Sequence, residues 1–88
     1  MTHITLSSES GTHAIRCVGH ATGSVEACAG ISAICLTVAK CLGEPVKLTA
    51  EEGFFEAVFI GQEELFRFAQ AGFEGICEEY GNYCKIMA

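Results

Sequence analysis

The sequence predicts an α/β fold of the α+β kind, a two-layer sandwich in which the elements follow the order β-β-α-β-β-α-β. Three observations support it. The chain has 88 residues, which is enough for a single domain spanning residues 1–88. Two long segments carry apolar residues at helical spacing, and the remaining segments are short runs of strand-forming residues separated by turn residues. We therefore expect a mixed or antiparallel sheet packed against two helices.

The N-terminal residues predict a β-hairpin. Residues 2–7 and residues 13–19 each alternate apolar and polar side chains, and residues 9–12 (Glu-Ser-Gly-Thr) between them favour a turn. His3 and His13 lie within these two strands. From the usual burial of histidine we expect both side chains to be exposed.

The longest apolar stretch predicts a helix over residues 26–42. Ser24 is a suitable N-cap, and Glu26 places a negative charge in the first turn. Gly43 and Pro45 end the helix. Its few polar residues fall within one arc, so we expect the sheet on one side of this helix and a further element covering another side.

Two further strands are predicted at residues 46–50 and 54–60, on either side of a glutamate- and glycine-containing turn. The second of them is an almost continuous apolar run. This pattern indicates either burial on both faces of the sheet or an exposed face used for dimerisation.

The C-terminal part predicts a second helix over residues 62–80 and a short last strand over residues 84–87. Gly72 and Gly75 lie inside this helix, and each weakens it by about 1 kcal/mol relative to alanine. Such glycines are expected where a neighbouring element packs closely.

The charge distribution argues against nucleic acid as a partner. The formal net charge is −6, the five basic residues are scattered, and all eleven acidic residues are glutamates, so the chain contains no aspartate. The N-terminus lacks the pattern of a signal peptide, and the longest apolar stretch is too short and interrupted to span a bilayer. A cytoplasmic location without membrane attachment is the resulting expectation.

The six cysteines contain no C-x-x-C pair, so the spacing does not indicate a zinc site, and no metal or other cofactor is expected. A disulfide framework would need an oxidising compartment, for which the sequence carries no signal. We expect Cys35, Cys41 and Cys77 to be small buried apolar residues.

His20 and Cys28 are the residues that we expect to carry chemistry. His20 follows the second predicted strand, and Cys28 lies about one turn into the first helix. The positive potential at a helix N-terminus and a neighbouring imidazole both lower the pKa of a thiol, and a thiolate at neutral pH is a nucleophile. The imidazolium can then protonate a leaving amine.

Three further residues accompany this pair as candidate substrate-binding residues. Gly19 and Gly23 allow the backbone to approach a bound chain and offer N–H groups to an oxyanion. Ser32 shares the helix face of Cys28. The alternatives left open by the residues are a buried structural cysteine with a surface histidine, and a metal site, for which only two ligands are at hand.

The motif Gly19-His20-Ala21, followed by Cys28-Ala29-Gly30-Ile31-Ser32, resembles the signature of the ribosomal-processing cysteine proteases (Prp). The resemblance extends over the whole chain, including the segment at residues 71–80. It implies a cysteine endopeptidase whose nucleophile is Cys28 and whose base is His20. It also implies a ribosomal or phage precursor protein as substrate, a role in ribosome biogenesis, and a homodimer.

Two departures from the family pattern bear on activity. The loop between His20 and Cys28 is several residues shorter than in typical members, and the aspartate that they carry before the cysteine is missing. Glu26 is the nearest carboxylate, but helical periodicity places it about 160° away from Cys28. The hypotheses are therefore a peptidase that uses a Cys28–His20 dyad and, alternatively, a non-catalytic peptide-binding or assembly module on the same fold.

Overall fold

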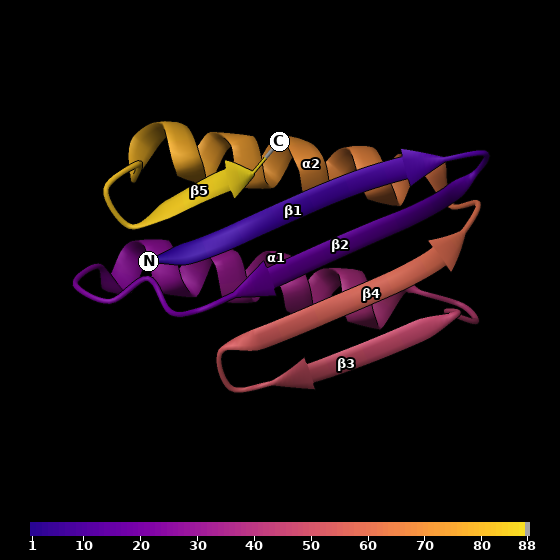
Figure 1. Ribbon diagram of the computed structural model, residues 1–88, viewed down its shortest axis with the longest axis horizontal. Coiled ribbons are helices and arrows are strands. Elements are labelled where there is room, and N and C mark those ends of the chain that lie inside the picture. The colour runs from indigo at the N-terminus through magenta and orange to yellow at the C-terminus, as the bar shows by residue number, and fades with distance from the viewer. Residues whose placement is uncertain (88) are drawn as a thin grey trace.

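A computed structural model describes residues 1–87 and contains the expected elements in the expected order. The elements are β1 (Thr2–Glu9), β2 (Thr12–Val18), α1 (Val25–Cys41), β3 (Lys47–Glu51), β4 (Phe54–Ile60), α2 (Glu63–Glu79) and β5 (Cys84–Met87). The five strands form one sheet in the order β3-β4-β2-β1-β5 (Figure 1). Only the β1–β5 pair is parallel among these neighbours. The predicted α+β fold with a mixed sheet is confirmed.

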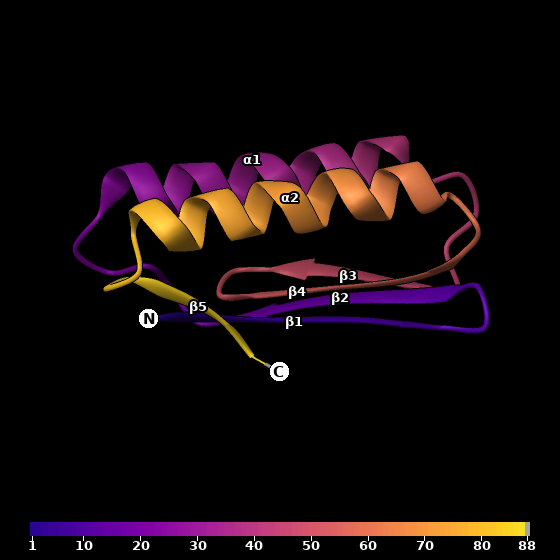
Figure 2. The same cartoon turned by 90° about the horizontal axis from the view of Figure 1, so that it is seen from above.

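The two helices lie on the same face of the sheet (Figure 2). The apolar core fills the space between these two layers, and it includes Ile4, Ile15, Phe59 and Phe73, which are almost completely buried. Along β4, buried side chains alternate with half-buried ones. The expectation of burial on both faces for residues 54–60 is therefore wrong, because within residues 1–87 the helices cover only one face of the sheet.

Ser24 begins α1, as the sequence predicts. Its side-chain oxygen accepts a hydrogen bond from the backbone N–H of Ala27 at 3.1 Å. Its own N–H donates to the carbonyl of Ala21 at 3.2 Å, and its carbonyl accepts from the N–H of Cys28 at 3.1 Å. These bonds satisfy amide groups that a helix terminus otherwise leaves without partners, and they fix the residue at which the helix starts.

The other end of α1 is held by Gln62, which precedes α2. The Gln62 side-chain amide donates to the carbonyl of Cys41 at 2.9 Å and accepts from the N–H of Gly43 at 3.3 Å. The carbonyl end of α1 is thus capped by a residue from the start of the other helix. α1 begins and ends one residue earlier than the predicted range of residues 26–42 and has the same length.

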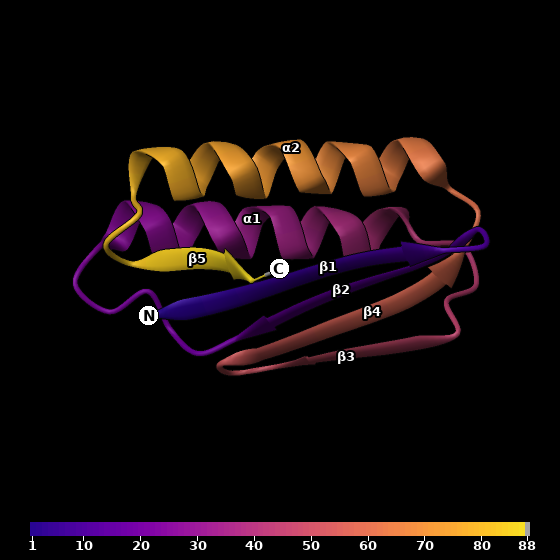
Figure 3. The same cartoon turned by 45° about the horizontal axis from the view of Figure 1, so that its top comes forward.

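The helices lie side by side and pack through glycines (Figure 3). A Cβ atom at Gly30 would stand 2.6 Å from Cδ1 of Ile76, and one at Gly72 would stand 2.8 Å from Cδ1 of Ile34. Each helix therefore receives an isoleucine of the other where it has no side chain. Gly72 is at a close contact as expected, whereas a Cβ at Gly75 would meet nothing within 4 Å.

This arrangement leaves one side of α1 uncovered. Val25 and Leu36 on this side are 79% and 69% exposed, whereas α2, the further element expected against this helix, covers another side of it. The physical reason is that α2 packs beside α1 on the sheet and not on top of it. Neither helix within residues 1–87 is long and apolar enough to cross a membrane.

His13 is buried, so the expectation that its side chain is exposed is wrong. The side chain is 1% exposed, and its ring stacks on Phe66 with centroids 4.5 Å apart. Its Nδ1 lies 2.8 Å from Oγ of Ser8, and its Nε2 lies 3.0 Å from a carboxylate oxygen of Glu63. The strand places residue 13 on the same side as Ile15, which faces the helices, so His13 is buried. His3 is exposed as expected.

The glycine packing predicts different effects on protein stability for two neighbouring glycine-to-alanine substitutions in α2. Gly75→Ala should stabilise the protein by about 0.5–1 kcal/mol, because alanine favours the helix and the added Cβ enters open space. Gly72→Ala should gain less or lose stability, because its Cβ meets Ile34. Urea unfolding of the three proteins measures this difference, and an equal gain for both substitutions would contradict the close packing of the helices.

Candidate active site

A groove of about 470 Å³ lies between α1 and the β3–β4 hairpin. It is open because the edge strand β3 has mostly exposed side chains and extends beyond the cover of the helices. His20 and Cys28 both line this groove. The other lining residues come from β1, β2, the loop before α1, α1 itself and the β3–β4 hairpin. They are Thr2, Cys17, Gly19, Ala21, Ile31, Ser32, Cys35, Leu36, Ala39 and residues 50–55.

Cys28 carries an exposed thiol in the first turn of α1. At this end of the helix the backbone dipoles produce a positive potential, which favours a thiolate. The backbone N–H of Cys28 donates to the carbonyl of Ser24 and is not free to bind an oxyanion. Cys28 also borders a second, shallower hollow of about 550 Å³ that includes Gly23 and Val25, so its thiol lies where the two depressions meet.

Two other cysteines form part of the groove wall but have little exposure. Cys17 and Cys35 are buried, with their sulfur atoms 3.8 Å apart. The hydrogen bond between the two thiols and their burial raise the pKa of Cys17. Cys17 is therefore a poor competitor of Cys28 as a nucleophile.

The remaining cysteines differ in exposure. Cys84 is buried and Cys77 is half-buried, and burial together with a hydrogen bond to Cys84 raises the pKa of Cys77 to about 12. Cys41 is exposed, so the expectation that it is buried is wrong: it occupies the last position of α1, where that helix has passed beyond the core.

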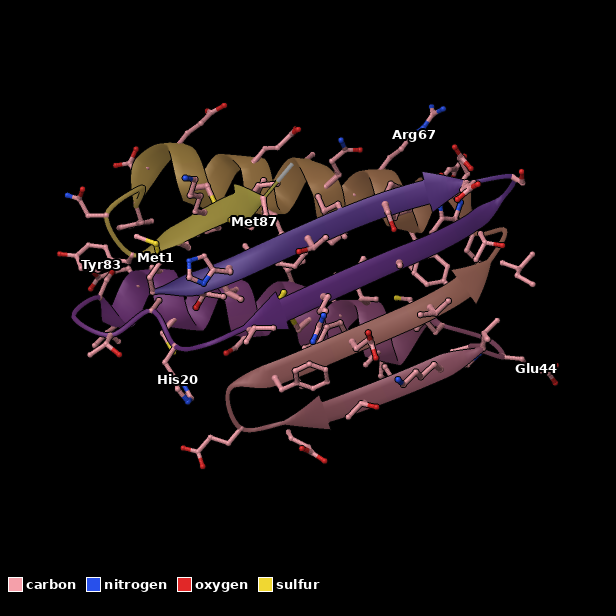
Figure 4. All side chains as sticks on the ribbon, viewed as in Figure 1. Met1, His20, Glu44, Arg67, Tyr83 and Met87 are labelled. Carbon is pink, nitrogen blue, oxygen red and sulfur yellow. The ribbon has the colours of Figure 1, made fainter. Side chains whose placement is uncertain are left out.

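His20 lies against the turn that joins β3 and β4. A Cβ atom on Gly53 would stand 2.8 Å from Nε2 of His20, so the imidazole occupies space left free by this glycine, whose φ is +76°. The N–H of Gly19 donates to the carbonyl of Gly53 at 2.8 Å, and the hydroxyl of Thr2 donates to the carbonyl of Gly19 at 3.3 Å. Figure 4 shows His20 at this end of the sheet, directed toward the turn.

The structure therefore brings His20 and Cys28 to one groove. Within residues 1–87 no hydrogen bond joins the thiol to the imidazole, and His20 instead packs against the hairpin turn. Both side chains are exposed, and His20 is carried by a loop.

The three predicted substrate-binding residues have different surroundings. The N–H of Gly19 is engaged by Gly53, so this residue lines the groove without offering a donor. Gly23 lines the second hollow, where an added Cβ would stand 3.1 Å from the Tyr83 ring. The exposed Ser32 side chain lies one helical turn beyond Cys28 on the groove wall, and within residues 1–87 its hydroxyl has no hydrogen-bond partner.

Two carboxylate residues of the groove were not singled out from the sequence. Glu51 and Glu52 line the groove beside His20, whereas Glu26 borders neither hollow. The signal available in the sequence was only that both immediately precede the turn glycine Gly53. Within residues 1–87 no three His, Cys, Asp or Glu side chains are grouped closely enough to hold a metal ion.

Comparison with solved structures finds the same fold in a protease. A crystal structure of the essential ribosomal processing protease Prp from S. aureus with a substrate peptide matches with a TM-score of 0.81 and 16% identity, covering 99% of this chain and 98% of that one. The same protein with a covalently linked product peptide matches with a TM-score of 0.79 and 17% identity, covering 98% and 97%. No protein-family model and no curated protein sequence matches the chain. The chain thus has the fold of Prp over nearly its whole length.

Proposed function

We propose that the protein is a cysteine endopeptidase in which Cys28 is the nucleophile and His20 the general base. One observation carries the proposal: the exposed thiol in the first turn of α1 opens into the same groove as the loop histidine. The similarity of the chain in fold to a processing protease supports the same function. A helix N-terminus and an imidazole are the two surroundings that most favour a reactive thiolate.

In the proposed reaction the Cys28 thiolate attacks the scissile carbonyl, and a C–S bond forms as the carbonyl oxygen becomes an oxyanion. Collapse of this tetrahedral intermediate breaks the C–N bond, and the His20 imidazolium gives its proton to the leaving amine. Water, deprotonated by His20, then hydrolyses the thioester and releases the Cys28 thiol. The groove binds one part of the peptide and the second hollow binds the part across the scissile bond.

Ser32 is the proposed donor to the oxyanion. In many hydrolases the backbone N–H of the nucleophile serves this purpose, but the N–H of Cys28 is engaged by Ser24. The Ser32 hydroxyl lies on the same groove wall and is free to donate. The positions of Cys28 and Ser32 at i and i+4 on one helix, which bring their side chains to one face, support this role.

The proposed substrate is a protein segment in an extended conformation. Apolar groove residues such as Ile31, Leu36 and Phe55 suit an apolar side chain of this segment. Since the structurally similar proteins are ribosomal processing proteases, we propose a ribosomal or phage precursor protein as the substrate class. A cytoplasmic location and a homodimer, with no nucleic acid or membrane partner, belong to the same proposal.

The alternative function is a peptide-binding or assembly module without catalysis. The specific observation that favours it is the position of His20, whose imidazole packs against Gly53 and makes no hydrogen bond to the Cys28 thiol. Under this alternative the groove holds a peptide that is not cut.

The proposal predicts that Cys28 is the most reactive thiol of the protein. Cys41 is a matched internal control, because it is also exposed and lies at the opposite end of the same helix. The helix dipole contributes about 0.3–1 kcal/mol at each end with opposite sign, so Cys28 should react with iodoacetamide at least about threefold faster at pH 7. Peptide mapping by mass spectrometry measures both rates. Equal rates would show that Cys28 is not activated.

The proposal also predicts cleavage of precursor peptides. Peptides that span the N-terminal extension of large-subunit ribosomal proteins, and the processed ends of phage capsid precursors, should be cut by the wild type and not by Cys28→Ser, whose side chain has almost the same size. Product masses identify the cleaved bond, and an acyl adduct on Cys28 identifies the nucleophile. Tight binding of such peptides by the wild type without cleavage would favour the binding module instead.

A further inference from the structure

The loop between His20 and Cys28 contains no aspartate, but glutamates of the β3–β4 hairpin line the same groove. We propose that Glu52 is the carboxylate that orients the His20 imidazole and stabilises its charged form, in place of an aspartate before the nucleophile. This inference rests on the proposed function, because it assigns a positioning residue to the same site.

His20 is in contact with the β3–β4 turn. The Gly19–Gly53 hydrogen bond of 2.8 Å ties the residue before His20 to the turn, and Gly53 leaves space for the imidazole. Glu52 and Gly53 are the two residues of this turn, because Glu51 and Phe54 on either side of them pair across the hairpin. Glu52 is therefore adjacent in sequence to the residue on which His20 packs.

Few carboxylates of the chain are candidates for this role. The chain has no aspartate, and Glu26 lines neither hollow. Glu51 and Glu52 both border the groove. Glu51 pairs with Phe54, whose ring lies under the guanidinium of Arg16 on the face of the sheet away from the helices. Side chains of paired residues share a face, so the side chain of Glu51 belongs to that open face and Glu52 is the one at the turn.

A carboxylate beside the imidazole has a defined chemical role in general base catalysis. A general base works best when a further group accepts a hydrogen bond from its second nitrogen, which fixes the tautomer and favours the imidazolium. The charged or titratable groups around His20 are the Cys28 thiol on α1, the carboxylates of Glu51 and Glu52 on the hairpin, and the amino group of Met1, whose carbonyl is next to Gly19. A carboxylate at the turn adds a negative charge on the side of the imidazole away from α1.

The test is an NMR titration of the His20 ring in the wild type, Glu52→Gln, Glu52→Asp and Glu51→Gln. Glu52→Gln should lower the midpoint of the His20 titration by about 0.5–1 pH unit, because the neutral amide no longer stabilises the imidazolium. Glu52→Asp should keep most of the wild-type midpoint. Glu51→Gln is the matched control and should change the midpoint by less than half as much.

Activity provides the second readout. With a cleavable peptide, Glu52→Gln should lower kcat with little change in KM and should shift the alkaline limb of the rate profile to lower pH, because the imidazolium that protonates the leaving amine is then lost at lower pH. A midpoint unchanged in Glu52→Gln, or changed equally in Glu51→Gln, overturns the assignment of Glu52. The titration needs no substrate, so it decides this inference even if no peptide is cut, whereas absence of cleavage by the wild type bears on the proposed function alone.

Discussion

The N-cap of α1 is the interaction on which the candidate site depends most. Ser24 is buried, and its hydroxyl, N–H and carbonyl all take part in hydrogen bonds, to Ala27, Ala21 and Cys28. These bonds turn the chain out of the loop and into the helix at one defined residue. They therefore place Cys28 in the first turn, with its thiol exposed and its own amide occupied. A helix that began one turn earlier would place the thiol in the second turn, away from the positive end of the dipole.

Contacts of two glycines between the end of β2 and the β3–β4 turn also shape the site. Gly19 and Gly53 hold the end of β2 to the β3–β4 turn, and the missing side chain at Gly53 accommodates His20. The edge strand β3 thereby forms one wall opposite α1, and the groove between them is open to a peptide. The proposed nucleophile, base and carboxylate thus come from a helix, a loop and a hairpin turn.

Much of the fold follows from local sequence signals. Residues 54–60 and 84–87 form strands with the predicted bounds, because turn residues limit them on both sides, and Ser24 caps the helix as its position suggests. The burial of His13 was mispredicted because a residue type that is usually exposed occupies a helix-facing position. The exposed side of α1 was not evident from the sequence, because apolar composition does not reveal whether a neighbour packs beside a helix or over it.

Some features of the candidate site also follow from the sequence, whereas others depend on the tertiary structure. His20 and Cys28 are close in sequence, so a short loop brings them to one groove, as expected. The role proposed for Glu52 was not accessible from the sequence, because it depends on the sheet order, which places the β3–β4 turn beside the end of β2. The exposure of Cys41 likewise depends on where the helix leaves the core.

The most direct test of the central claim is the pH dependence of Cys28 alkylation in the wild type and in His20→Ala. Free cysteine titrates near pH 8.5. The account predicts that alkylation of the wild type reaches its half-maximal rate about one pH unit or more below this value, and that His20→Ala moves the midpoint back toward it. If Cys28 shows the same midpoint, near or above pH 8.5, in both proteins, then His20 does not activate the thiol and the peptidase account is contradicted.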